Sequence, residues 1–168
     1  MAIIGLFMLS VVSYAASATL RPDSNGFLNQ WTKTGCGSNY QCVDEATVNT
    51  SDYLSIGVNT RYQTFGFQNL VGNASAVQNV TLYYYAKLFN ASQTKMVPMV
   101  RVNTSNYFGS TITLTANYTL YSYTWSANPK TGLSWTVSDV NALEAGMRSA
   151  SPNGGGNVAQ VYARISYT

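Results

Sequence analysis

The side chains that most enzymes use for acid–base or nucleophilic chemistry are scarce in this chain. Its 168 residues include no His and six carboxylates, and charged residues make up 9% of the sequence, against roughly a quarter in an average protein. Without an imidazole, Ser and Cys side chains lack their usual general base, and metal sites built on His are excluded. The chain also has no glycine-rich phosphate-binding motif. The composition therefore predicts a non-enzymatic protein that holds no cofactor.

Three of the six acidic residues are close enough in sequence to share a loop. Asp44, Glu45 and Asp52 could supply the hard oxygen ligands that Ca²⁺ prefers. Their spacing matches no known calcium loop, and the alternative is that they are solvated turn residues. Because Asp44 and Glu45 are adjacent, they would point to opposite faces of a strand and could not form the opposed pair of a glycosidase.

The chain has two cysteines, Cys36 and Cys42, which flank the short segment Gly37–Gln41. A disulfide between them would close a small loop and indicate an oxidising compartment. The alternative is a pair of reduced, buried thiols. We favour the disulfide because other features of the sequence also point to the outside of the cell.

Sequons for N-glycosylation are the clearest of these features. Six asparagines stand in the pattern N-x-[ST]: Asn49, Asn73, Asn79, Asn90, Asn103 and Asn117. Some would arise by chance in a chain so rich in Asn, Ser and Thr. Together with the cysteine pair, they predict a glycosylated protein that is extracellular or at the cell surface.

Aromatic side chains supply a further candidate for ligand binding. Tyr121, Tyr123, Trp125 and Trp135 could form a platform on which sugar rings stack. The alternative, which we favour, is that these rings pack in the core and across neighbouring strands. The consecutive residues Tyr83–Tyr85 must divide between the two faces of a strand.

The nine cations are spread along the chain and give a formal net charge of +3. A surface that follows a phosphate backbone needs clustered cations, so no nucleic-acid partner is expected. All charged residues follow position 20.

The uncharged segment Met1–Leu20 has three interpretations. As a helix it would be about 30 Å long, close to the thickness of a bilayer's hydrocarbon core. It could be a secretory signal peptide cleaved after Ala15 or Ala18, a retained membrane anchor, or an assembly helix buried against copies of itself. A membrane would then be a partner only through residues 1–20 or before assembly.

The pattern from Arg21 onward predicts strands that must position these groups. The strand candidates are Phe27–Trp31, Leu54–Val58, Thr64–Phe67, Val77–Phe89, Met96–Val102, Ser110–Ala116, Leu120–Trp125 and Val158–Tyr167. The alternation in Val77–Phe89 places Val80, Leu82, Tyr84 and Ala86 on one face.

The last strand has the clearest register. Ala159, Val161, Ala163, Ile165 and Tyr167 are expected to point inward. Gln160, Tyr162, Arg164 and Ser166 are expected to point outward. Pro98 places Met96–Val102 at a sheet edge or a bulge.

One short helix is predicted at Asp139–Ala145, with Ser138 as its N-cap and Gly146 at its C-terminal end. The predicted fold is therefore mainly β, an antiparallel β-sandwich with jelly-roll-like topology over residues 21–168. An apolar N-terminal helix over residues 1–20 would precede it.

An uncharged apolar start, followed by a β domain rich in Ser, Thr, Asn and Tyr with many sequons, resembles the subunits of archaeal type IV pili and related extracellular filaments. In that family the apolar helix forms the filament core and the β domain, often glycosylated, coats it. The resemblance covers Met1–Leu20 in kind and the remainder in architecture. Position 5 is Gly where bacterial pilins commonly have Glu, and no charged leader precedes the apolar segment.

The globular part also looks like the jelly-roll modules of viral and cell-surface appendage proteins, with its Arg21-Pro22 start, Trp135-Thr136 and its final strand. Two functions follow. The first is a non-enzymatic structural subunit that assembles with copies of itself into a pilus-like filament or surface layer. The alternative is a secreted carbohydrate-binding or appendage module with a cleaved signal peptide, whose partners are surface glycans.

Overall fold

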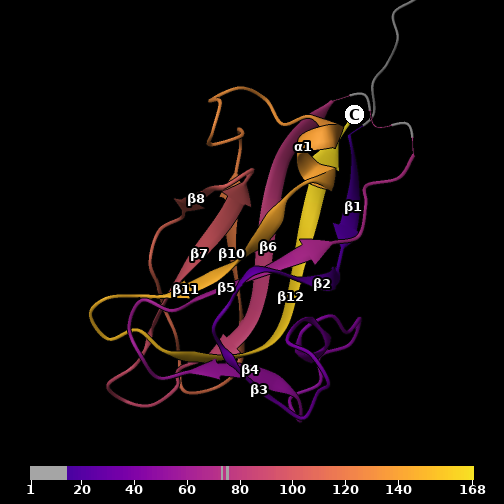
Figure 1. Cartoon of the computed structure of the whole chain (residues 1–168). Helices are drawn as coiled ribbons and strands as arrows, with labels where there is room; N and C mark the ends of the chain where they lie inside the picture. The colour runs from indigo at the N-terminus through magenta and orange to yellow at the C-terminus, as the bar shows by residue number, and fades with distance from the viewer. Residues whose placement is uncertain (1–14, 73, 75) are drawn as a thin grey trace, which may run out of the picture.

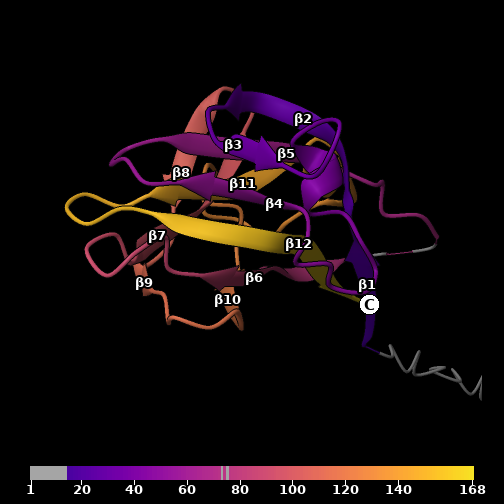
Figure 2. The ribbon, with the colours of Figure 1, turned by 90° about the horizontal axis from the view of Figure 1, so that it is seen from below.

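The structure, a computed structural model, describes residues 15–72, 74 and 76–168. Within this part, antiparallel strands form two sheets (Figures 1 and 2). Sheet A has the order β10-β6-β12-β4-β3, with β1 also paired to β12, and sheet B has the order β2-β5-β11-β7-β8, with β9 also paired to β7.

The strands of sheet A are β1 (Ala16–Leu20), β3 (Thr32–Thr34), β4 (Tyr53–Ile56), β6 (Val77–Lys87), β10 (Thr119–Trp125) and β12 (Gly156–Tyr167). Those of sheet B are β2 (Pro22–Asn29), β5 (Tyr62–Phe67), β7 (Lys95–Val102), β8 (Ser105–Phe108), β9 (Ile112–Thr113) and β11 (Glu144–Ser149). A 3-10 turn, η1 (Tyr40–Cys42), and a short helix, α1 (Val137–Asn141), complete the described elements.

The two sheets face each other across one hydrophobic core. Buried side chains of both belong to a single cluster, including Leu82 of β6, Val161 of β12, Phe65 of β5 and Val100 of β7. The chain crosses repeatedly between the sheets, as the step from β5 to β6 and then to β7 illustrates. The mainly β, antiparallel prediction is confirmed, whereas the jelly-roll assignment stays a prediction.

The alternation predicted for the two longest strands is confirmed. In β6, Val80, Leu82, Tyr84 and Ala86 are each 0% exposed. In β12, the predicted inward and outward rows hold from Val161 onward. A β-bulge between Val158 and Gln160 breaks the pattern before that point, and both residues are buried. An extra residue in one strand shifts its pleat against the partner, which is why the period of two fails there.

Pro98 lies in β7, which is an interior strand of sheet B rather than an edge strand. The outer partner of β7 is interrupted at this point, because β8 pairs from Met99 onward and β9 pairs with Met96. Gly109, between the two partners, donates to the carbonyl oxygen of Pro98 at 2.8 Å. The N and C=O of one strand residue point to the same side, so the missing N–H faces this gap and removes no bond to β11.

The helix predicted at Asp139–Ala145 is shorter and starts earlier. It spans Val137–Asn141, and its N-cap is Thr136 rather than Ser138. Thr136 and Asp139 form a capping box, in which each side chain accepts a hydrogen bond from the other residue's backbone N–H. This reciprocal pair determines where the helix begins.

The C-terminal end of the predicted helix belongs instead to strand β11. The alternation of inward and outward residues in this strand was not recognised in the sequence. Ala145 and Met147 point into the core, both 0% exposed, and Gly146 is not a helix cap. The backbones of β11 and β5 approach so closely at Gly146 that a Cβ there would clash with the carbonyl oxygen of Gln63. Pairing with β5 and β7 on both sides outweighs the local helix signal.

The strand predicted at Ser110–Ala116 is reduced to the two residues of β9, and β3 and β8 were not predicted.

The prediction of an apolar N-terminal helix is wrong for Ala16–Leu20, which form β1. This strand pairs with Ala163–Tyr167 of β12, and Leu20 is buried in the core. The rest of the predicted helix, residues 1–14, lies outside the described residues.

Because Ala16–Leu20 belong to sheet A, the sheet begins before the predicted domain start at Arg21. None of the helices formed by residues 15–72, 74 and 76–168 has the length and apolar character needed to span a bilayer.

Candidate ligand-binding site

The outer face of sheet A, which points away from the core, carries paired tyrosines. Tyr83 of β6 lies opposite Tyr162 of β12 in the sheet register. Their rings stack with centroids 4.8 Å apart and planes 9° from parallel. Since each ring has one face against its partner, the other face of each is directed away from the pair.

A second pair extends the row. The rings of Tyr85 and Tyr118 stack at 5.6 Å with planes 7° from parallel, and the Lys87 ammonium lies 4.8 Å from the centre of the Tyr118 ring. Burial, with a smaller contribution from Tyr53, raises the pKa of Tyr118 to about 12. We call Tyr83, Tyr85, Tyr118 and Tyr162 the tyrosine platform.

A depression of about 480 Å³ adjoins the platform on this face. It is open to solvent on one side, and β1, β6, β10, β12 and the loop after η1 contribute to its walls. The lining residues are Thr19, Arg21, Ala46, Tyr83, Leu120, Gln160, Tyr162 and Arg164.

Gln160 fixes the loop that forms one rim of the depression. Its side chain is 5% exposed, and its Nε2 donates to the carbonyl oxygens of Glu45, at 2.6 Å, and Ala46, at 3.4 Å. The bulge in β12 places Gln160 in this position. Its outward direction was predicted, but its burial beneath the loop was not, because the loop comes from a distant part of the chain.

Arg21 holds the same rim from the other side. Its guanidinium donates to the carbonyl oxygens of Glu45 and Ala46 and lies 5.7 Å from the centre of the Tyr162 ring. Arg164 is exposed, and its Nε and Nη2 donate to Ser17 Oγ of β1 at 3.2 and 3.0 Å. Both guanidinium-bearing residues therefore line the depression together with Tyr162.

The ionisation of Tyr162 reflects these neighbours. Burial and the nearby Tyr83 raise the pKa of Tyr162 above its ordinary value of 10.0, and the charges of Arg21 and Arg164 oppose this shift. The phenol is therefore a neutral hydroxyl at physiological pH. The site offers ring faces, hydroxyls, an amide and two guanidiniums, which suits binding and hydrogen bonding rather than proton transfer.

The aromatic residues singled out from the sequence are on the other side of sheet A. Tyr121, Tyr123 and Trp125 of β10 lie opposite the inward residues of β6, and Trp125 is 6% exposed. Trp135 is 2% exposed and donates from Nε1 to the Trp125 carbonyl oxygen at 3.1 Å. All four rings therefore pack in or against the core, as in the alternative favoured from the sequence, and a stacking role for them stays a prediction.

The alternation of inward and outward residues along the strands could have identified part of the tyrosine platform from the sequence. The outward row of β6 contains Tyr83 and Tyr85, and that of β12 contains Tyr162, so these rows could have been matched. The contributions of Tyr118, Arg21 and Ala46 could not, because all three lie outside the strands, where no alternation assigns a face.

The acidic residues Asp44, Glu45 and Asp52 do not form a calcium site. Within the described residues, no group of three or more His, Cys, Asp and Glu side chains could hold a metal ion. Burial, followed by the neighbours Asp52 and Asp44, raises the pKa of Glu45 to about 7. Glu45 Oε2 and Asp52 Oδ1 are buried and have no hydrogen-bond partner among the residues that the structure describes.

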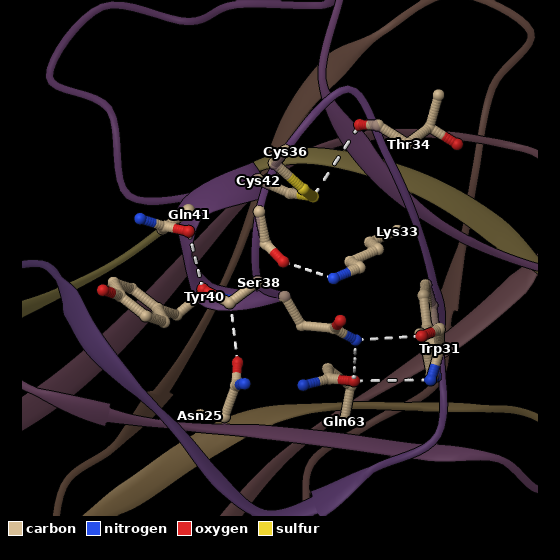
Figure 3. Close-up of a disulfide and its surroundings, with 12 residues drawn as sticks. Asn25, Trp31, Lys33, Thr34, Cys36, Ser38, Tyr40, Gln41, Cys42 and Gln63 are labelled. Atoms are coloured by element: carbon tan, nitrogen blue, oxygen red, sulfur yellow. Dashed lines mark hydrogen bonds between the residues drawn. A yellow bond between two sulfur atoms is a disulfide. The ribbon is translucent and has the colours of Figure 1, made fainter.

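The disulfide between Cys36 and Cys42 is confirmed, with Cα atoms 5.3 Å apart. Figure 3 shows it closing the loop that leads into η1. Asn39 anchors this loop from within, because its Nδ2 donates to the Trp31 carbonyl oxygen at 2.9 Å and to Gln63 Oε1 at 3.0 Å. Cys42 is 0% exposed and packs in the core. The bridge thus tethers the segment from which the rim of the depression continues.

The predicted glycosylation sites differ in their surroundings. The exposed residues are Asn49, Asn90, Asn103 and Asn117, and Asn79 is half-buried in β6. Asn73 lies outside the described residues. Asn49 and Asn90 each accept a hydrogen bond from the backbone N–H two residues later, which is a turn geometry of surface loops. Their modification stays a prediction.

Comparison with protein-family models and with curated proteins finds no match. Among solved structures, the chain is similar to the enzymatically active domain of tailspike protein 4 of bacteriophage CBA120, with 14% identity, a TM-score of 0.41 and coverage of 89% of this chain and 19% of that one. It is also similar to a mutant family 29 carbohydrate-binding module, with 12% identity, a TM-score of 0.40 and coverage of 92% and 91%.

Proposed function

We propose that this protein is a non-enzymatic, extracellular module that binds carbohydrate in the depression on the outer face of sheet A. The observation that carries the proposal is the stacked pair Tyr83–Tyr162, which adjoins a cavity of about 480 Å³ lined also by Gln160 and two arginines.

A saccharide has apolar C–H faces and a rim of hydroxyls, so it needs aromatic surface next to fixed polar groups. The depression combines these features. Tyr83, Tyr162 and the half-exposed Leu120 supply apolar area. Gln160, Thr19 and the guanidiniums supply hydrogen-bonding groups, and Gln160 is held in place by its own bonds to the loop.

The extracellular location is supported by the disulfide Cys36–Cys42 and by the sequons on exposed loops. Of the two predicted signal-peptide cleavage sites, the one after Ala15 would leave β1 whole. Cleavage after Ala18 would remove three residues of the strand that pairs with β12.

The filament-subunit hypothesis gains no support from the described residues. Its characteristic element is the apolar N-terminal helix, and Ala16–Leu20 form a strand instead. Assembly with copies of the same chain therefore stays a prediction that rests on the sequence.

The experiment is a glycan array with the full chain, followed by calorimetric titration of the strongest ligand. Tyr162→Ala and Tyr83→Ala should each weaken binding by about tenfold or more, because removal of a central aromatic contact typically costs over about 1.4 kcal/mol. Tyr62→Ala is the matched control, since Tyr62 is a half-buried tyrosine of sheet B. Absence of saccharide binding, or equal loss in all three variants, would contradict the proposal.

A further inference from the structure

We propose that the saccharide bound in this depression is acidic and that its carboxylate is held between Arg21 and Arg164. This inference rests on the proposed function, because it names the class of sugar that the same site takes.

The lining has positive charge without a matching negative charge. Arg21 and Arg164 are its two charged residues, and no carboxylate side chain belongs to the described residues that line the depression. A neutral saccharide would require no cations there. Since both guanidiniums act on the charge state of the Tyr162 phenol, they project their field into the same space.

Both guanidiniums retain donors for a ligand. An arginine has five N–H donors. The hydrogen bonds of Arg21 go to the carbonyl oxygens of Glu45 and Ala46, and those of Arg164 go to the hydroxyl of Ser17. These acceptors are neutral, so they orient the two groups without neutralising them. The planar guanidinium fork matches the geometry of a carboxylate.

Asp44 and Glu45, which lie in the loop that Arg21 contacts, do not line the depression. Arg21 acts on the Asp44 carboxyl, although burial outweighs this effect and the pKa of Asp44 is raised. The pKa of Glu45 is raised to about 7 by burial, Asp52 and Asp44, so this carboxyl is only partly charged at neutral pH. The loop therefore offsets the two arginines incompletely.

The platform orients a bound sugar relative to these charges. The guanidinium of Arg21 lies over the Tyr162 ring at 5.7 Å, and Arg164 is two residues further along the same face of β12. A sugar seated in the depression beside Tyr162 would place a substituent carboxylate within reach of either arginine, since both line the same space. The carboxylate of a uronic acid is attached directly to the sugar ring, which fits this short span.

The experiment measures the affinity of the full chain for oligomers of galacturonate, glucuronate and mannuronate, each beside its methyl ester, in which the charge is removed. Neutral gluco-, manno- and galacto-oligosaccharides complete the panel. At least one acidic oligomer should bind about tenfold or more tightly than its ester, because a hydrogen bond to a charged partner contributes that much. Added salt should reduce this preference, since the site is open to solvent.

Arg164→Gln is the main variant because Arg164 is exposed, and within the described part of the chain its side-chain hydrogen bonds go to Ser17. It should remove most of the preference for acid over ester, because it should weaken binding of the acid much more than binding of the ester. Arg164→Lys should retain part of the preference. Arg101→Gln is the control, because Arg101 is an arginine of sheet B that lies 4.6 Å from the Phe27 ring.

Tighter binding of an acid that depends on Arg164 supports the inference. Binding of neutral sugars or esters at the strength of the acids, or a preference that survives in Arg164→Gln, overturns it and leaves the carbohydrate-binding function standing. Failure of every oligosaccharide to bind overturns both.

Discussion

Tyr83 and Tyr84 are adjacent residues of the same type in β6, yet the two faces of sheet A give them different roles. Tyr84 is 0% exposed, and its hydroxyl donates to the Gly146 carbonyl oxygen of the opposite sheet at 2.5 Å. Tyr83 is half-buried on the outer face and stacks on Tyr162 beside the depression. The inner tyrosine joins two sheets, whereas the outer one lines the depression in which we propose that a ligand binds.

The difference shows that residue type alone does not distinguish a core aromatic from a binding aromatic. Both tyrosines bring a large ring and a polar end. What separates them is whether the hydroxyl and the free ring face meet protein or solvent, and this depends on strand parity. The inner face should therefore control stability and the outer face affinity, and the loop between Cys36 and Asp52 should affect both.

Substitution of the two tyrosines gives the largest expected contrast. Tyr84→Ala should lower the free energy of unfolding by about 3–5 kcal/mol, through the cavity and the lost contact between sheets. Tyr83→Ala should lower it by about 1 kcal/mol, as expected for one stacked pair at a surface. Urea denaturation of both variants measures this difference, and Tyr84→Phe isolates the hydroxyl, at about 1 kcal/mol. Equal losses in the two alanine variants would refute the division between faces.

The disulfide is the next test, because it tethers a loop that touches both faces. Replacing Cys36 and Cys42 together by Ser should lower the free energy of unfolding by about 2 kcal/mol, the amount expected from the entropy of so short a closed loop. Saccharide affinity should also fall, since the chain continues from Cys42 to the rim at Ala46. Ser38→Ala, within the same loop, is the control. Identical denaturation midpoints with and without a reducing agent would show that the bridge does not stabilise the fold.

The smallest effect is a pH dependence of stability that originates at Glu45. Its pKa in the folded protein is about 7, against an ordinary value of 4.5. The folded state binds its proton more tightly, so this stabilisation is complete below about pH 4.5 and is lost as pH rises through 7. Because Glu45 is partly exposed, solvent screening reduces the effect to the order of 1 kcal/mol.

Denaturation of wild type and Glu45→Gln between pH 4.5 and 7.5 measures this effect. Glu45→Gln should remove the decline in stability across the window. Asp23→Asn, at an exposed position of β2, should retain the decline. A wild-type curve that rises over this range would mean that Glu45 is not held in its acidic form by the loop.

The core of sheet A could be predicted from the sequence because its pattern is local. In β6 the alternation of Val80, Leu82 and Tyr84 with outward residues is enough to assign the buried face. The cysteine pair and the strand around Tyr162 were equally readable. In β11, by contrast, the three residues before Gly146 are compatible with a helix, and the sequence therefore predicted one there. The alternation of buried and exposed side chains that marks a strand became evident only from its pairing with β5 on one side and β7 on the other.

The candidate site could be predicted only in part, since its members come together from distant segments. Gln160 contacts the loop at Glu45 across 115 residues of sequence, and Arg164 contacts Ser17 across 147. No local pattern reports such pairings, and the bulge that positions Gln160 has no sequence signature strong enough to locate it.

By itself, the sequence determined the chemical character of this protein: no imidazole, few carboxylates, many neutral hydrogen-bonding groups, a closed cysteine loop and mainly β structure. These properties follow from residue types and short spacings, which folding does not change. The tertiary structure alone decided which outward tyrosines stack on one another and which cations share a cavity. Those outcomes depend on sheet register and on contacts between segments more than a hundred residues apart, where small shifts in pairing reverse which face a side chain occupies.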